Sequence, residues 1–240
     1  MNIIIIRHGD PDYVNDTLTK KGRQEAVALA KFLKDIPVKK YYCSPMGRAR
    51  DTAAPTLNVL DRRAQILDWL HEFPDCVTDP KSGSKHVPWD FLPGEWTKIP
   101  EFYDKDKWHE TDIMKTGNAH EVYDYICTQL DNLLASYGYV REGACYRAVI
   151  PNHETIVFIC HFGVMCAILS HLLGISPVLL WQGAICPPTG ITRVSTEERE
   201  EGIAYFRCNR FGDVSHLYLD GQRPSRAGRF RETSGESSLD

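Results

Sequence analysis

Two short apolar runs stand out in the pattern of hydrophobic and polar positions, at residues 2–6 (NIIII) and 155–160 (TIVFIC). Unbroken apolar runs of this length that are rich in β-branched residues are typical of strands buried on both faces of a parallel sheet. We expect two segments near the end of the chain to form a hairpin or to lie side by side as neighbouring strands. These two segments are residues 190–198 and 202–209. Weaker strand patterns also occur at residues 38–45 and 64–70.

Between these runs, apolar residues recur with helical spacing. In residues 19–35 they fall at positions i, i+3, i+4 and i+7 from Ala26, which predicts a helix capped by Thr19. Similar patterns predict helices at residues 46–60, 119–138 and 164–174. Pro55 is expected to bend or end the first of these three helices. Strands that alternate with helices in this way predict an α/β fold, in which helical crossovers join parallel strands.

The segment from about residue 74 to residue 118 has a different composition, since it combines five prolines with many aromatic residues. Such a segment is too aromatic for disorder and too rich in proline for one regular element. We interpret it as an ordered insertion within a single catalytic domain of residues 1–220, either as a lid or pocket wall or as a packing flap without a ligand role. The tail at residues 221–240 is rich in Gly, Ser and Arg and is expected to be loose.

The overall composition is that of a soluble globular protein, with 42% hydrophobic and 25% charged residues. A formal net charge of −4 argues against a general nucleic-acid binder, although the local field of a pocket can still favour a small phosphorylated ligand. The apolar runs are well short of a membrane span, and the first residues do not resemble a signal peptide. The eight cysteines form no CxxC pair, so we expect reduced thiols in a cytoplasmic protein. From the charge and the short apolar runs, we expect no membrane or nucleic-acid partner. The sequence does not indicate an oligomeric state.

Each of the two strongest apolar runs ends in a histidine, in the sequences NIIIIRHG and TIVFICHFG. Ligands of open α/β sheets bind beyond the carboxyl ends of the strands, so His8 and His161 can face one pocket. Arg7 and Arg48 offer donors suited to an oxyanion, and the helix that begins near Phe162 adds backbone N–H groups. A single histidine is more often a structural residue, but together these groups predict a phosphoryl-binding site.

Five motifs resemble, in order, those of the histidine phosphatase superfamily, also called phosphoglycerate mutase-like. They are RHG at 7–9, LTKKGRQEA at 18–26, SPMGRARDTA at 44–53, the Glu of LHEF at 72 and CHFG at 160–163. The resemblance covers residues 1 to about 175. It implies a three-layer αβα sandwich around a mostly parallel central sheet.

The resemblance also implies roles for particular residues. His8 would be the nucleophile that forms a phosphohistidine. Arg7, Arg48 and His161, with the backbone at Phe162, would bind the phosphoryl group. Glu72 would protonate the leaving oxygen and then help to activate water. No metal ion or other cofactor is implied.

The sequence departs from the mutases of this superfamily at two places. After RHG, many mutases have Glu and then Asn, whereas this chain has Asp10 and an Asn15 that comes one position late. The mutase segment after the acidic residue is replaced by HEFPDCVTDP. These departures favour hydrolysis of phosphomonoesters by a histidine acid phosphatase-like enzyme. A phosphoglycerate mutase and a non-catalytic phospho-ligand-binding module remain the alternatives.

Three further assignments concern individual residues. Asp68 and Asp75 are near enough to Glu72 to be rival acids, but Glu72 fits the Leu-x-Glu pattern of the superfamily. His216, in DVSHL, is interpreted as structural rather than catalytic. The substrate is expected to be a small phosphomonoester of unknown identity. Its leaving group is predicted to meet Asp10 and aromatic residues of the insertion, which could equally pack the insertion: Trp89, Phe91, Trp96 and Trp108.

Overall fold

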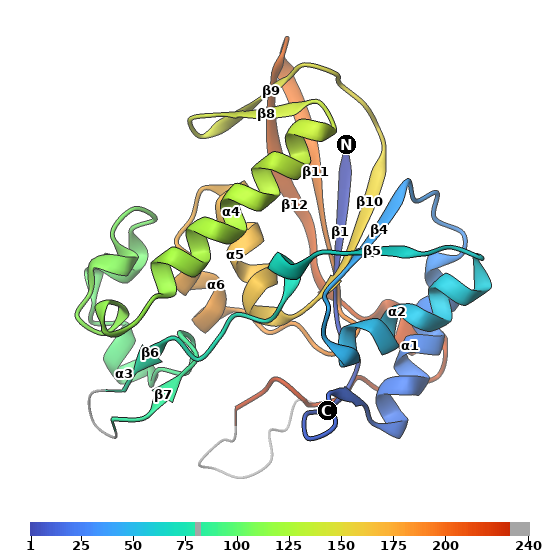
Figure 1. Ribbon diagram of the computed structural model, residues 1–240, viewed down its shortest axis with the longest axis horizontal. Coiled ribbons are helices and arrows are strands. Elements are labelled where there is room, and N and C mark those ends of the chain that lie inside the picture. The colour runs from blue at the N-terminus through green and yellow to red at the C-terminus, as the bar shows by residue number, and fades with distance from the viewer. Residues whose placement is uncertain (80–82, 231–240) are drawn as a thin grey trace.

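The computed structural model describes residues 1–79 and 83–230. Its centre is an eight-stranded sheet (Figure 1). In spatial order the strands are β5 (Ala64–Ile66), β4 (Lys40–Cys43), β10 (Thr155–Cys160), β1 (Asn2–Arg7), β11 (Ile191–Glu200), β12 (Ile203–Asp213), β9 (Cys145–Ala148) and β8 (Tyr139–Glu142). The four strands predicted in the first two thirds of the chain therefore lie side by side.

The sheet is mixed, with parallel strands on the side that begins at β5. The pairs β5–β4, β4–β10 and β10–β1 are parallel, and the remaining neighbours are antiparallel. Only β11 and β9 run against the direction of β1. In the centre, Asn2 lies opposite Thr155 and Arg7 lies opposite Cys160, so β1 and β10 end at the same level. This register places the two strand-end histidines next to each other.

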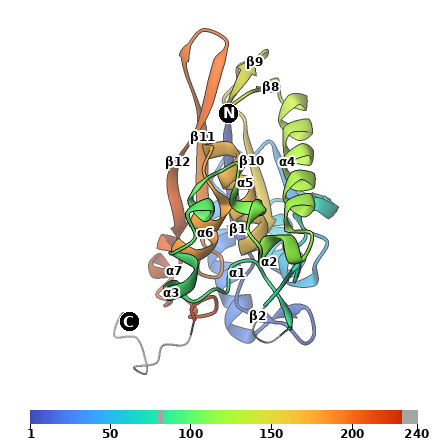
Figure 2. The ribbon, with the colours of Figure 1, turned by 90° about the vertical axis from the view of Figure 1, so that its left-hand side faces the viewer.

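Helices cover both faces of the sheet (Figures 1 and 2). One layer contains α1 (Lys20–Leu33), α2 (Gly47–Val59) and α7 (Ser215–Leu219), and the other contains α4 (Ala119–Ser136), α5 (Phe162–Leu173) and α6 (Pro177–Gly183). Successive residues of β1 point into different layers: Ile4 packs in the same apolar cluster as Leu29 of α1, and Ile5 in the same cluster as Ile168 of α5. The predicted three-layer αβα sandwich is confirmed.

The helices on the α1 side follow the sequence pattern closely. Thr19 caps α1, since its side chain accepts a hydrogen bond from the backbone N–H of Gly22. Pro55 lies inside α2 and does not end it, because the helix continues to Val59. An interior proline disturbs the helical ladder locally, by its missing N–H and by crowding the carbonyl of residue i−4, and the buried residues of α2, such as Ala53, hold the helix against the sheet.

The aromatic insertion is an ordered assembly of short elements beside α6. These are β6 (Val77–Thr78), β7 (Lys85–His86), α3 (Pro93–Trp96) and the 3₁₀ turns Pro100–Tyr103, Trp108–Glu110 and Met114–Thr116. Phe102 and Trp108 are buried, and the ring of Trp108 packs edge to face against that of Trp181 in α6, with centroids 5.6 Å apart. The insertion therefore continues the hydrophobic core on the α5 side of the sheet.

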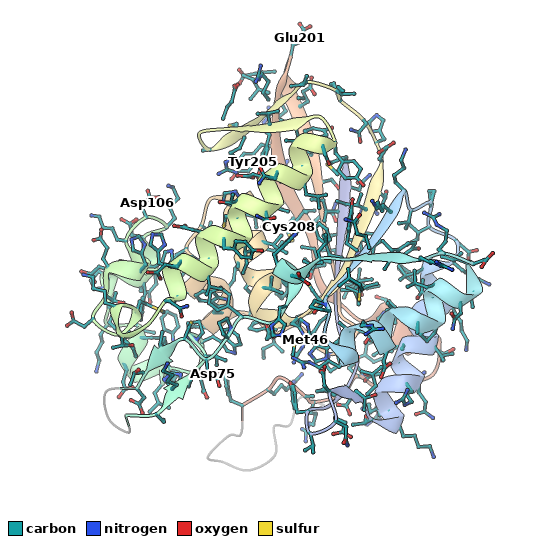
Figure 3. The ribbon with its side chains drawn as sticks, in the orientation of Figure 1. Met46, Asp75, Asp106, Glu201, Tyr205 and Cys208 are labelled. Atoms are coloured by element: carbon teal, nitrogen blue, oxygen red, sulfur yellow. The ribbon has the colours of Figure 1, made fainter. Side chains whose placement is uncertain are left out.

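The last third of the chain adds two hairpins and a docked segment. β11 and β12 form the predicted hairpin, whose tip is Glu201 (Figure 3). The hairpin of β8 and β9 was not predicted. Residues 221–230, the described part of the tail that was expected to be loose, follow α7 without regular secondary structure, and Ser225 is buried among them. Residues 231–240 lie outside the described part of the chain.

Two global features concern the expected environment of the protein. All eight cysteines lie in the described part of the chain, and each is a free thiol. No helix within residues 1–79 and 83–230 is long and apolar enough to cross a membrane.

Candidate active site

Three neighbouring parallel strands end at the lower edge of the sheet in Figure 1, and a polar residue follows each of them directly. His8 follows β1, Ser44 follows β4, and His161 follows β10, the strand between them. The imidazole rings of His8 and His161 have their centroids 5.1 Å apart. The two histidines predicted to share a pocket are therefore brought together.

His8 is buried, with 1% of its surface exposed, and its ring is fixed by the backbone. Nδ1 lies 2.8 Å from the carbonyl oxygen of Gly9, so this nitrogen carries the proton and donates it to the carbonyl. Burial and the neighbouring Arg7 lower the pKa of His8 to about 3. The imidazole is therefore neutral near pH 7, with the lone pair of Nε2 available for attack.

His161 is held by a side chain from the next strand end. Its Nε2 lies 2.8 Å from Ser44 Oγ, which also accepts a hydrogen bond from the N–H of Met46. The Ser44 hydroxyl can then donate to Nε2, which places the ring proton of a neutral His161 on Nδ1. Burial and the nearby His8 lower the pKa of His161 well below its ordinary value. His161 Nδ1 is buried and has no partner among the described residues.

The two arginines are anchored at one end and free at the other. Arg7 Nη1 donates to the carbonyl oxygen of Cys186 at 2.6 Å, and Arg48 Nη1 donates to Asp16 Oδ1 at 2.7 Å. The other oxygen of Asp16 accepts from the N–H of Gly47 at the start of α2. Burial acts to raise the pKa of Asp16, but these hydrogen bonds outweigh it and lower the pKa. Asp16 is thus a charged group that fixes Arg48.

Glu72 reaches the same place from the segment after β5. Its Oε1 accepts hydrogen bonds from the N–H of Phe73 at 2.8 Å and from those of Gly163 and Val164 in the first turn of α5, at 3.0 and 3.3 Å. These bonds fix the carboxyl group and leave Oε2 as the oxygen that can carry a proton. Burial raises the pKa of Glu72 despite the hydrogen bonds and both nearby arginines. A raised pKa suits a general acid.

Unpaired donors are the main electrostatic feature of this site. Arg7 Nε, Arg48 Nε and His161 Nδ1 are buried without a hydrogen-bond partner in the described part of the chain. Buried donors in native proteins are nearly always satisfied, so three orphans on residues that meet at these strand ends indicate a ligand with several acceptor oxygens. Two guanidinium groups favour a ligand that is also anionic.

The aromatic residues predicted to meet the leaving group occupy different places. Trp89 lies against the start of α5, where a Cβ on Gly163 would collide with its ring, and its centroid is 6.0 Å from that of Phe162. Phe91 stacks on Phe102 at 5.9 Å. These contacts place Trp89 beside Glu72, whereas Phe91 packs within the insertion.

Trp96 and Trp108 also belong to the packing of the insertion. Trp96 pairs with Tyr103, with ring centroids 5.9 Å apart. Trp108 has 1% of its surface exposed and belongs to the hydrophobic core on the α5 side of the sheet. Phe162 lies nearer the site, with the Arg7 guanidinium 6.0 Å from its ring centroid.

The acidic residues named from the sequence are separated by the structure. Asp10 directs one carboxylate oxygen to Thr19 and the other to Ser225, so both oxygens face protein groups. Asp68 and Asp75 are exposed, and Figure 3 shows Asp75 at the side of the insertion. Of the three candidate acids Glu72, Asp68 and Asp75, Glu72 is therefore the one whose carboxyl group accepts hydrogen bonds from α5.

Sequence reasoning missed three residues around His8. Thr52 accepts a hydrogen bond from the N–H of Gly9, and Asp16 holds Arg48. Tyr13 is 64% exposed, lies edge to face with His8 at 6.4 Å and has the Arg48 guanidinium 5.4 Å from its ring centroid. Thr52 was inside the SPMGRARDTA motif, whereas Asp16 and Tyr13 lie in a loop without a periodic signal. His216, expected to be structural, is buried against Thr189, with its pKa lowered to about 4 by burial.

Within the described ranges, no group of three or more His, Cys, Asp or Glu side chains could hold a metal ion. The fold and the orphaned donors together describe an α/β protein with a candidate anion site at its parallel strand ends. The sequence model of the histidine phosphatase superfamily (branch 1) matches residues 3–76. The predicted resemblance to this superfamily is therefore confirmed.

Solved structures of similar fold extend the likeness to most of the chain. A phosphoserine phosphatase variant from Entamoeba histolytica, in complex with phosphoserine, has a TM-score of 0.60 at 19% identity, over 90% of this chain and 98% of that one. A mycobacterial glucosyl-3-phosphoglycerate phosphatase has a TM-score of 0.61 at 19% identity, over 89% and 99%. The α-ribazole phosphatase of Shigella flexneri has a TM-score of 0.55 at 16% identity, over 89% and 96%. A sequence search of curated proteins found no significant match. The structural likeness shows a shared fold.

Proposed function

We propose that the protein is a metal-independent phosphomonoesterase that works through a phosphohistidine on His8. The observation that carries the proposal is the set of three unpaired buried donors around a neutral imidazole, described above. A tetrahedral phosphoryl group offers the several negatively charged acceptor oxygens that such a set requires. The three solved structures of similar fold are all named as phosphatases of small phosphorylated molecules, which agrees with this proposal.

In the first step, His8 Nε2 attacks phosphorus opposite the leaving oxygen. The new N–P bond forms as the P–O bond breaks, and protonated Glu72 gives its proton to the departing oxygen. In the second step, a water molecule gives a proton to the Glu72 carboxylate and attacks the phosphohistidine. The N–P bond then breaks, which releases inorganic phosphate and restores both residues.

The surrounding groups stabilise charge during both steps. Arg7 and Arg48 can each donate through Nε to equatorial phosphoryl oxygens, and His161 can donate through Nδ1. The first turn of α5, which begins at Phe162, contributes the positive end of a helix dipole. Since these donors are held by Cys186, Asp16 and Ser44, they need little reorganisation when the ligand binds.

The test is to trap the intermediate. Wild-type protein mixed with a ³²P-labelled phosphomonoester and quenched rapidly should carry acid-labile label, and His8→Ala should carry none and lose activity by at least about 10³-fold. His153→Ala is the matched control, because His153 is exposed next to β10 at the opposite end of that strand from His161. Equal hydrolysis by His8→Ala and wild type would refute the nucleophile assignment.

The same preparation separates the two alternative functions. Wild-type protein given 3-phosphoglycerate and 2,3-bisphosphoglycerate should release phosphate without net exchange between the two monophosphate isomers. Isomer formation without phosphate release would identify a mutase. Tight phosphate binding without turnover on a broad panel of phosphomonoesters would identify a binding module.

A further inference from the structure

The docked end of the chain reaches the candidate active site. Residues 223–228, which we call the strap, follow α7 and continue along the start of α1 toward Arg7, and Figure 1 shows this segment at the lower edge of the sheet. The residues just before the strap are tied to α1 by an ion pair from Asp220 to Lys31 at 2.5 Å and by a hydrogen bond from the Gln222 side chain to the carbonyl of Gln24 at 3.2 Å. The route of the strap is therefore fixed before it reaches the site.

Two carboxylates next to the RHG motif anchor the middle of the strap. Ser225 donates its hydroxyl to Asp10 Oδ1 and its backbone N–H to Glu25 Oε1, the latter at 3.2 Å. Glu25 is fully buried in α1, and its other oxygen accepts from the N–H of Asp10 at 2.8 Å. Thr19 donates to the second oxygen of Asp10. Each carboxylate oxygen of Asp10 and Glu25 thus accepts a hydrogen bond from a protein group. Neither carboxylate takes part in the reaction steps proposed above.

The end of the strap contacts Arg7 through its backbone. Arg7 Nη1 donates to the carbonyl oxygen of Ala227 at 3.3 Å, in addition to that of Cys186 at 2.6 Å. Gly228 lies so close that a Cβ there would collide with Nη1, and its φ of +102° is also disfavoured for other residues. The strap therefore contacts the guanidinium group of Arg7 through backbone atoms.

These two bonds determine which side of Arg7 faces the ligand. Nη1 has two N–H groups, and two carbonyl oxygens accept them. The guanidinium plane is then fixed, and the Nε–Nη2 edge remains as a pair of parallel donors for two oxygens of one phosphoryl group. Arg7 Nε is one of the orphaned buried donors, as this arrangement requires.

We infer that the strap is a positioning element of the phosphate site, with Ser225 as the residue that anchors it and Arg7 as the residue through which it acts. The inference rests on the proposed function only in taking phosphate as the ligand of Arg7. It predicts that loss of the strap weakens phosphate binding. An autoinhibitory strap would have the opposite effect, since its removal would strengthen binding and raise the rate.

The chain offers a matched pair of truncations. One ends after residue 222 and removes the strap, and the other ends after residue 230 and removes only residues outside the described part. Calorimetric titration with inorganic phosphate should show affinity about tenfold weaker for the shorter chain and unchanged for the longer one, because the shorter chain loses a hydrogen bond to a charged group. kcat/KM should fall by a similar factor. Unchanged or tighter phosphate binding by the shorter chain would overturn the inference.

A double-mutant cycle distinguishes positioning from a general loss of structure. If the strap acts through Arg7, the truncation after residue 222 should weaken phosphate binding no further in an Arg7→Ala background. Additive losses would overturn the inference.

Ser225→Ala and Ser225→Thr give a second test in the full chain, which does not depend on the folding of the truncated form. The alanine variant should lose several-fold in phosphate affinity, and the threonine variant, which keeps the hydroxyl, should recover most of it. Equal affinities of all three would contradict the anchor. Wild-type protein that binds phosphate without hydrolysing esters would defeat the proposed function and leave this inference standing.

Discussion

The phosphate side and the leaving-group side of the candidate site are built in different ways. On the phosphate side, His8 and His161 stand at the ends of adjacent buried strands, and the backbone of Gly9 and the side chain of Ser44 each fix one ring nitrogen. On the leaving-group side, Trp89 belongs to an insertion of short elements and is held by ring packing against Phe162 and its neighbours.

This difference separates chemistry from selectivity. Hydrogen bonds with fixed donors and acceptors hold a side chain to a few tenths of an ångström, as a transition state requires. Aromatic packing sets the shape of a wall and tolerates exchange of one ring for another. We therefore expect substitutions on the phosphate side to lower the rate for every substrate. Substitutions on the other side should alter the order of substrates.

The largest effect that sharpens this comparison is expected at Glu72, where the two sides meet. Glu72→Gln keeps an oxygen that can accept the N–H groups of Phe73, Gly163 and Val164 but cannot supply a proton. Activity should fall by about 10²- to 10⁴-fold with poor leaving groups. Asp68→Asn and Asp75→Asn are matched controls, because both carboxylates are exposed and neither should matter.

The pH profile checks the same assignment. Because burial raises the pKa of Glu72, the proton is retained to higher pH than on an ordinary glutamic acid, and wild-type kcat/KM should decline as pH rises through that raised pKa. The pKa of His8 is lowered to about 3, so protonation of the nucleophile should remove activity only near and below that pH. Glu72→Gln should lose the limb at higher pH. A wild-type limb that survives in this variant would assign the proton to another group.

A smaller effect is expected from Asp16, which orients Arg48 on the phosphate side. Asp16→Ala removes the acceptor of Arg48 Nη1 and of the Gly47 N–H, so kcat should fall about tenfold as the guanidinium loses its fixed orientation. Asp35→Ala is the control, since Asp35 is an exposed carboxylate after α1. An undiminished kcat in Asp16→Ala would show that Arg48 is positioned without this contact.

The sequence predicted the parts of the site that depend on local pattern. His8 and His161 could be found because an apolar strand, a histidine and a glycine lie within a few positions, and because parallel strands bring such ends to one edge. Asp16 and Ser225 could not be found in this way. Ser225 meets Asp10 across 215 positions of sequence, and neither residue lies in a periodic element. Strand and helix alternation predicted parallel strands joined by helical crossovers but not the order β5-β4-β10-β1, and the hairpin of β8 and β9 had no strong apolar run to indicate it.

Composition could not show that Trp89 lies beside the site and Trp108 in the core. Substitutions at these two tryptophans give the smallest predicted effects on activity. Trp89→Leu should change relative rates across a panel of phosphomonoesters by several-fold while phosphate affinity stays the same, because the ring lies beside Glu72 and Phe162 but bonds to no phosphate donor. Trp108→Leu is the matched substitution in the core. It should leave the order of substrates unchanged and lower the free energy of unfolding by about 2–4 kcal/mol, because it opens a cavity against Trp181 and Tyr123. Steady-state rates and denaturant unfolding of both variants measure the two effects separately. If Trp108→Leu reordered the substrates and Trp89→Leu did not, the wall of the leaving-group side would have to be sought deeper in the insertion.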